Sequence, residues 1–178
     1  AMLYSLAPSD NAVREGHLVL TETESFTERS MIMELPALWE VQRYFEASFD
    51  LRVGGGGDNR GAGVSVCLGV LPEVPFGELG AGDGLRLLLR TEAERLEVYF
   101  GDVLLLGRSL PLSLVRTGDW VHVLLELSPS DGLSVQMGGE WLVHDLILTP
   151  WAPLSSWRFG IGARTGGEHY DEHRIDNV

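Results

Sequence analysis

The residues with the most reactive side chains stand together near the end of the chain. Residues 168–172 read EHYDE and follow directly on Gly166-Gly167. Carboxylates and imidazoles exchange hydrogen bonds with hydroxyl groups, and the Tyr170 ring offers a flat face for stacking. A polar loop delivered by two strands is a common recognition site on a rigid scaffold. We therefore predict that this segment binds a ligand.

A metal site is the first alternative for the same residues. His169 and His173 are four residues apart, with Asp171 between them. On a helix this is a zinc-binding spacing. The segment has the pattern of a loop and a strand, however, so a solvated loop is the better interpretation. We expect neither a metal ion nor another cofactor.

Catalysis is the second alternative. Glycoside hydrolysis needs two carboxyl groups roughly 5–5.5 Å apart for retention, or roughly 6.5–9.5 Å apart for inversion. The chain has no E-x-D-x-E pattern, and Glu172 and Asp176 share a strand face only if that strand begins by Glu172. It has no G-x-S-x-G motif, and GGGGDNRGAG lacks the Lys-Ser/Thr that binds phosphate. These residues favour binding over enzymatic activity.

Length and charge exclude further classes of function. The chain has 178 residues, of which 44% are hydrophobic, and a formal net charge of −13. This length predicts one domain with a single core. The acidic balance disfavours nucleic acid as a partner, and no apolar run is long enough to span a membrane. Val178 ends the chain inside an expected strand, so residues 1–178 are expected to be a module cut from a longer protein.

Alternation with period two recurs along the chain and predicts strands. Residues 44–53 give the clearest case, with one face formed by Phe45, Ala47, Phe49, Leu51 and Val53. Similar patterns occur at residues 18–20, 64–68, 85–89, 96–100, 121–127, 133–137, 142–148 and 157–163, with a short last strand at 174–178. Many short strands divided by Gly, Pro and Asp turns predict an all-β fold, a two-sheet antiparallel jelly-roll sandwich. Cys67 lies in such a strand and is expected to be a packed thiol.

Three glycine-rich segments interrupt these strands, at residues 54–60, 72–84 and 166–167. Glycine permits positive φ and lets a ligand approach the backbone closely. Strand geometry alone can also demand such turns. Both interpretations of the loops stay open.

The tryptophans also have two interpretations. An indole stacks well on the apolar face of a sugar ring, and Trp39 and Trp151 lie in expected loops. Trp120, Trp141 and Trp157 fall in strand patterns, which favours the core or the sheet surface.

Four segments follow one another in a characteristic order. They read RYFEASFDLRV (43–53), GAGVSVCLG (61–69), GDWVHVLLEL (118–127) and WRFGIGARTGG (157–167). In turn they resemble the FSTSFDF strand, the ADGxxFxL strand, the W-x-x-V-x-I strand and the FGFSASTG strand of L-type (legume-type) lectins, within the concanavalin A-like superfamily. The resemblance covers nearly the whole chain. It implies a concanavalin A-like sandwich that binds sugar at one edge.

Two positions depart from the pattern of that family. Legume-type lectins bind sugar through the Asp of the ADG turn, and Ala62 stands in its place. They hold calcium with a pattern like FDTxxN, where this chain has Arg90 and Thr91, with Glu92 and Glu94 as the nearest acids. Calcium needs about six to eight oxygen ligands, several of them carboxylates. The comparison therefore implies the lectin scaffold without its metal-dependent sugar site.

Two functions are compatible with these observations, and a β-glucanase-like hydrolase is a less favoured third. The first is a non-catalytic module that binds glycan through loops at one edge, outside the cell or at its surface as part of a larger protein. The second is a protein–protein interaction or architectural domain that has lost sugar binding. The residues expected to bind the ligand are Asp58, Asn59, Gly80, Gly82, Arg164, Thr165, Gly166, Gly167, Glu168, His169, Tyr170 and Asp171.

Overall fold

The computed structural model describes residues 4–6, 13–14, 16–35, 43–54, 60–149, 151–168 and 170–178. Within them the backbone forms fourteen strands and one short helix. The strands are β1 (Tyr4–Leu6), β2 (Val13–Arg14), β3 (His17–Thr21), β4 (Glu28–Glu34), β5 (Phe45–Gly54), β6 (Gly63–Gly69), β7 (Leu85–Arg90), β8 (Arg95–Phe100), β9 (Val103–Ser109), β10 (Trp120–Ser128), β11 (Gly132–Met137), β12 (Glu140–Leu146), β13 (Arg158–Arg164) and β14 (Glu172–Asp176), and the helix is α2 (Leu112–Val115).

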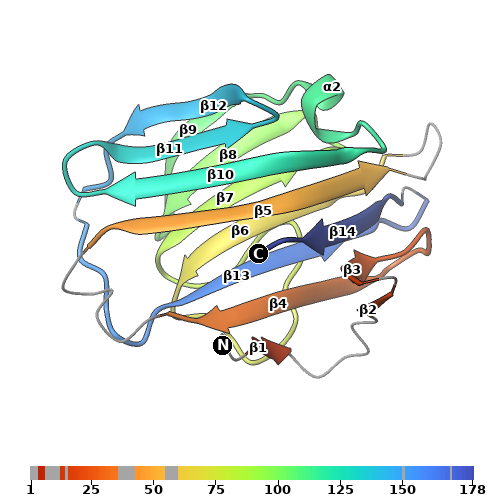
Figure 1. Ribbon diagram of the computed structural model, residues 1–178, viewed down its shortest axis with the longest axis horizontal. Helices are drawn as coiled ribbons and strands as arrows, with labels where there is room; N and C mark the ends of the chain where they lie inside the picture. Colours follow the sequence, from red (N-terminus) through yellow and green to blue (C-terminus); the bar gives the residue numbers. More distant parts are fainter. Residues whose placement is uncertain are drawn as a thin grey trace.

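The strands form two antiparallel sheets that lie face to face (Figure 1). Sheet A has the order β1-β4-β13-β6-β7-β8-β9, and sheet B has the order β12-β11-β10-β5-β14-β3-β2. Segments far apart in the chain lie side by side, because β13 pairs with β4 and β6 while β14 pairs with β3 and β5. The predicted all-β jelly-roll sandwich is confirmed.

The core lies between the sheets and follows the alternation of the strands. β5 pairs with β10 so that Phe49 lies beside Val123 and Leu51 beside Val121. All four side chains are buried in the same apolar layer. Removing one such side chain from water stabilises the fold by roughly 1.5–3 kcal/mol. The inward face predicted from residues 44–53 is the face that packs here.

Among the strands that were not predicted, β4 and β9 lack the alternating pattern. β4 buries Met31, Ile32 and Met33 in succession. Met31 and Met33 face the central core, whereas Ile32 belongs to a second apolar cluster on the outer face of sheet A. β9 is the edge strand of that sheet and is largely exposed. Alternation arises only where one face is buried and the other is solvated, so neither strand shows it.

The loop of residues 70–84 forms the cover over the outer face of sheet A. Its Phe76 ring packs onto β13, where a Cβ added at Gly162 would come within 2.6 Å of the ring. Leu71 of the loop occupies the same space above Gly160. Cys67 lies beneath this cover as a free, buried thiol whose pKa is raised to about 11 by burial. The expected packed thiol is confirmed.

The two ends of the sandwich differ in their connections. The loop end, on the right in Figure 1, carries the connections 22–27, 61–62, 91–94, 110–119 and 165–171. The turn end, on the left, carries the β10–β11 turn and the connection from β12 to β13. In the described part of the chain, no helix is long and apolar enough to cross a membrane.

Candidate functional site

Asp171 is the buried centre of the loop end. Its carboxylate is fully buried and accepts a hydrogen bond from the Gly61 backbone N–H at 2.8 Å. Arg116 donates to it from both Nε and Nη2, each at 2.9 Å. Two-pronged pairing of this kind is stronger and more directional than a single contact. The structure therefore places Asp171 beneath the surface, where it joins three connections of the loop end.

Buried threonine hydroxyl groups form further hydrogen bonds between the connections of the loop end. Thr91 Oγ1 donates to the Gly61 carbonyl at 2.6 Å, and Thr21 Oγ1 donates to the Asp171 carbonyl at 3.0 Å. His173 Nδ1 lies 2.6 Å from Thr21 Oγ1. Since the hydroxyl proton goes to the Asp171 carbonyl, Nδ1 must carry a proton and donate to Thr21. Burial lowers the pKa of His173 to about 4, so this ring is neutral at pH 7.

Arg164, at the end of β13, forms a two-pronged ion pair with Glu78 of the covering loop. Nε donates to Oε2 at 2.7 Å and Nη2 donates to Oε1 at 2.5 Å. Glu78 is buried, whereas the Arg164 side chain is 43% exposed. The hydrogen bond to Glu78 raises the pKa of Arg164 above its ordinary value. The guanidinium is thus held in one orientation while part of it faces solvent.

An exposed aromatic residue that the sequence reasoning missed lies over the same loop. Phe26 is 83% exposed, and its backbone N–H donates to the Gly166 carbonyl at 3.1 Å. Its ring lies over Gly167, where an added Cβ would be 2.7 Å from Cζ. Thr165 N donates to the Thr27 carbonyl at 2.9 Å and aligns the two loops. The available signal was a single phenylalanine within the polar segment TETESFTE.

Other predicted residues complete this group or lie beyond what the structure describes. Glu168 is exposed and Tyr170 is half-buried in the connection from β13 to β14. Asp58, Asn59 and His169 lie outside the described residues.

Gly80 and Gly82 adopt backbone conformations that the covering loop of residues 70–84 requires. Both have positive φ, +66° and +90°, which favours glycine. A Cβ at Gly80 would lie 2.8 Å from the Cys67 sulfur, and one at Gly82 would lie 2.9 Å from the Val70 carbonyl oxygen. Val70 follows the end of β6 that is opposite to Gly63. The structure therefore does not bring Gly82 to the loop end.

The positions that depart from the pattern of legume-type lectins, Ala62 for the sugar-binding Asp and Arg90 and Thr91 for calcium ligands, make other contacts here. Ala62 is buried, and Arg90 Nη1 lies 3.8 Å from a carboxylate oxygen of Glu97. Thr91 begins the short turn 91–94 between β7 and β8, and its hydroxyl is bound to the backbone. Among the described residues, no three His, Cys, Asp or Glu side chains converge in a way that could hold a metal ion.

The last strand begins two residues earlier than predicted, at Glu172. Glu172 and Asp176 therefore share a face of β14, as a carboxylate pair would require. Residues four apart on a strand are separated by about 13 Å, which exceeds either glycosidase spacing. Arg174 lies between them and donates to Glu172 at 2.6 Å, while Asp176 pairs with His17 at 3.0 Å.

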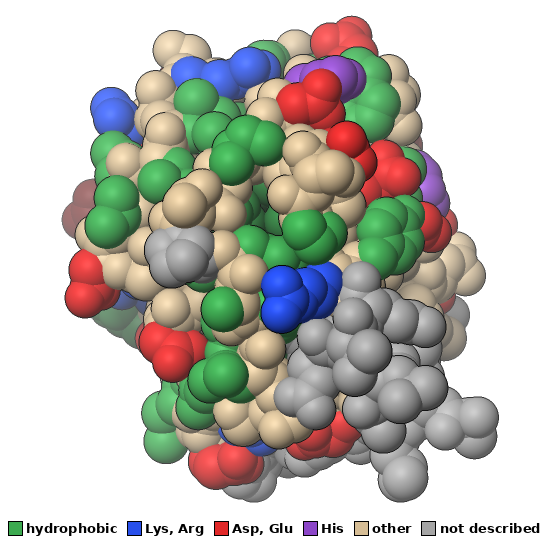
Figure 2. All heavy atoms as spheres, turned by 90° about the vertical axis from the view of Figure 1, so that its left-hand side faces the viewer, with side chains coloured by type: hydrophobic (Ala, Val, Ile, Leu, Met, Phe, Trp, Pro, Cys, Tyr) green, Lys and Arg blue, Asp and Glu red, His purple; other side chains and the backbone are tan. Residues whose placement is uncertain are grey.

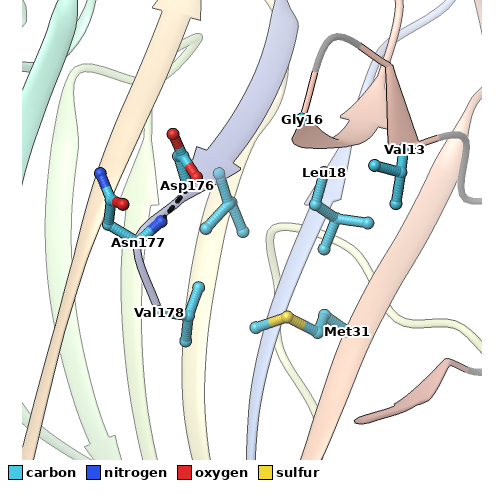
Figure 3. A pocket seen from close by; sticks show the side chains of 8 residues that line it. Val13, Gly16, Leu18, Met31, Asp176, Asn177 and Val178 are labelled. Atoms are coloured by element: carbon cyan, nitrogen blue, oxygen red, sulfur yellow. Dashed lines mark hydrogen bonds between the residues drawn. The ribbon is translucent and has the colours of Figure 1, made fainter.

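A cavity of about 290 Å³ opens between the sheets, beside β2 and β3. Figure 3 shows the side chains of Leu18, Met31 and Val178 around this space, with Asp176 and Asn177 at its rim. Its walls are mostly hydrophobic. None of the predicted ligand-binding residues lines it, so it is separate from the loop end.

Comparison with solved structures reveals similar folds. The chain aligns over 98% of its length with the exoplasmic/lumenal domain of VIP36 in a Ca²⁺/Man-bound form, at 18% identity and a TM-score of 0.73, covering 80% of that chain. It aligns over 98% with lectin I-B4 from Griffonia simplicifolia, at 13% identity and a TM-score of 0.68, covering 90% of that chain. Lectin II from Ulex europaeus gives 98% coverage, 12% identity and a TM-score of 0.72, with 89% of that chain covered. No protein-family model matches the chain, and no curated protein matches it.

The likeness extends over nearly the whole sandwich, and it agrees with the order of motifs along the sequence. At identities of 12–18% this likeness shows the fold alone. The two sheets, their antiparallel pairing and the alignment over 98% of the chain lead to one conclusion: this protein has an L-type lectin-like fold.

Proposed function

We propose that the chain is a non-catalytic recognition module that binds glycan at the loop end. The observation that carries this proposal is the exposed Phe26 ring above Gly167, in a loop that begins at the fixed Arg164 guanidinium. An aromatic ring stacks on the apolar face of a sugar, and charged groups exchange hydrogen bonds with its hydroxyls. The Ca²⁺/Man-bound form of the similar VIP36 domain supports this class of ligand.

The proposed site has a contact layer and a supporting layer. The contacts are Phe26, Arg164, Gly166, Gly167, Glu168 and Tyr170, together with Asp58, Asn59 and His169. Asp171 and Thr165 support them from beneath, because both are buried and bound to neighbouring connections. A recognition loop held in this way loses little conformational entropy when a ligand binds.

We further propose that binding does not need calcium. The positive charge of the Arg90 guanidinium repels a calcium ion. The Thr91 hydroxyl donates its hydrogen bond to the Gly61 carbonyl, so it is already engaged with the backbone. The turn 91–94 also leaves little chain from which to build a cage of oxygen ligands.

Glycan-array binding in EDTA tests both proposals. The unmodified chain should bind a defined set of glycans, and added calcium should not change the set. Phe26→Ala and Tyr170→Ala should each weaken binding by roughly two- to tenfold, the range expected for loss of one aromatic stacking contact. Leu154→Ala, an exposed apolar substitution at the turn end, is the matched control and should bind normally. Binding that appears only with calcium would overturn the calcium-free site.

A protein-interaction module is the second candidate, and the turn end favours it. Exposed apolar side chains gather there, including Val103, Ile147 and Leu154, which are 61%, 55% and 52% exposed. Figure 2 shows hydrophobic side chains across the middle of this end. Clustered exposed apolar groups are typical of interaction surfaces. An array on which folded protein binds no glycan would favour this candidate over the first.

We propose that residues 1–178 form one domain of a larger protein located in the secretory pathway or outside the cell. The exoplasmic/lumenal description of the VIP36 domain supports this location. Tagging the full-length parent protein and testing its access to an externally added protease would check it.

A further inference from the structure

A concavity of about 200 Å³ lies on the outer face of sheet B, near the turn end. It is far from the loop end, because Tyr44 precedes β5 and Ser128 ends β10. Figure 2 looks onto the turn end and shows acidic and histidine side chains gathered toward the upper right, where sheet B faces outward. The residues that matter for its chemistry are Tyr44, Glu126, Asp131, Trp141, His144 and Asp145.

Two aromatic rings line this concavity and remain open to solvent. Trp141 is 45% exposed and Tyr44 is 47% exposed. Trp141 is steadied by an edge-on contact with the His144 ring, with centroids 5.1 Å apart and an interplanar angle of 83°. Rings held in this way present electron-rich faces to a ligand.

Carboxylates surround the same space, and the lining contains no Lys or Arg. Ser128 and Ser130 donate to Asp131 at 2.8 and 2.9 Å, which lowers the pKa of Asp131 and keeps it ionised. Ser134 donates to one oxygen of the Asp145 carboxylate at 3.4 Å, and His144 Nδ1 lies 2.9 Å from the other oxygen.

The Tyr44 hydroxyl lies beside two carboxylates. It donates to Glu46 at 2.8 Å, and this hydrogen bond, together with the charges of Glu46 and Glu126, raises the pKa of Tyr44 to about 12. A phenol surrounded by carboxylates resists losing its proton. The same field attracts a positive charge placed over the ring.

We propose that this concavity is a binding site for an organic cation of the alkylammonium class. Exposed aromatic faces beside carboxylates, with no Lys or Arg among the lining residues, are the combination that binds such groups. A compact metal ion fits less well, since no three acidic or histidine side chains in the described part of the chain converge on one point. The site is independent of the proposed glycan site, because it lies on another face and shares no residue with it.

Titration of the full chain with tetramethylammonium chloride, followed by ¹H–¹⁵N NMR at constant ionic strength, tests the site. The Trp141 indole N–H signal should shift in a saturable way, and sodium chloride should produce no such shift. Trp141→Ala, followed through the backbone amide signals of His144 and Asp145, and Glu126→Gln should each weaken binding by roughly two- to fivefold. Glu140→Gln removes an equal charge from the neighbouring exposed position outside the concavity and should leave binding unchanged. Phe26→Ala should also leave it unchanged, which separates this site from the loop end.

Two further probes distinguish the source of the cation. Glucosamine binding more tightly than Nα-acetyl-lysine amide would indicate an amino sugar, and the reverse order would indicate a lysine side chain. Glucose that binds as well as glucosamine would overturn the proposal, because the site would then recognise hydroxyl groups and not charge. Equal losses in Glu126→Gln and Glu140→Gln would overturn it too, since the effect would then come from overall charge.

Discussion

At the scale of single residues, Asp171 shows that a side chain predicted to bind a ligand can instead stabilise the fold. The sequence places it among polar neighbours, and this suggests a ligand contact. In the structure its carboxylate is buried, and both oxygens are bound by Arg116 and the Gly61 backbone. The same contacts connect segments 110 and 55 residues away along the chain. The Asp171 carboxylate therefore holds the connections of the loop end together without reaching the surface.

Arg116→Ala tests this role. The change leaves a buried carboxylate without its cation, and this should lower the free energy of unfolding by about 3–5 kcal/mol. Urea denaturation followed by circular dichroism measures it. Arg108→Ala, at an exposed position of β9, should change stability by less than about 0.5 kcal/mol. Equal effects of the two substitutions would show that the Arg116–Asp171 pair does not stabilise the loop end.

At the scale of strands and loops, sequence patterning succeeds where one face is buried. β5 and β10 alternate, and their residues pair as the pattern implies. β4 could not be predicted in this way because the core covers one of its faces and the 70–84 loop covers the other. The loop itself could be predicted, but its packing could not, because the contact of Phe76 with Gly160 and Gly162 depends on tertiary structure.

The candidate site likewise has a part that could be predicted from the sequence and a part that could not. Arg164 to Tyr170 could be predicted as one loop because these residues are consecutive. Phe26 could not be assigned to that loop, since the adjoining bond between Thr27 and Thr165 spans 138 positions. Local patterns carry no information about contacts of such long range. A lone aromatic residue in a polar connection is the only local sign.

Phe76→Ala tests the packing of the covering loop through the thiol beneath it. Wild-type Cys67 is buried and its pKa is raised to about 11, so a thiol reagent should label it only slowly in native buffer. Removing the Phe76 ring opens a cavity over the same cluster and should raise the labelling rate by at least about tenfold, with a stability loss of about 3–5 kcal/mol. Leu154→Ala, an exposed substitution at the turn end, is the control and should leave the labelling rate of Cys67 unchanged. Fast labelling of the wild-type protein would contradict the position of the loop.

At the scale of the whole molecule, acidic residues outnumber basic ones by 26 to 13, and every basic residue is an arginine. Several arginines are used to pair buried or half-buried carboxylates, as in Arg116–Asp171 and Arg164–Glu78. The remaining acids give the protein its net charge of −13. Mild acidification reduces the mutual repulsion of these acids, so it should favour the folded state. One buried group acts in the opposite direction.

His173 should make the fold less stable as the pH falls. Its folded pKa of about 4 is below the ordinary value of 6.5, because burial disfavours the charged ring. Between these values the unfolded chain binds more protons than the folded chain. The contribution of His173 to the free energy of unfolding is therefore complete above pH 6.5 and declines as the pH falls toward 4, by about 3 kcal/mol in total.

His173→Asn tests this contribution. It keeps a side-chain N–H for Thr21 but removes the titration, so the slope of unfolding free energy against pH should flatten between pH 6.5 and pH 4. His144→Asn changes an exposed histidine and should keep the wild-type slope. An unchanged slope in His173→Asn would show that another group controls acid stability, since the lowered pKa of Asp50 lies below its ordinary value of 3.8 and outside this window.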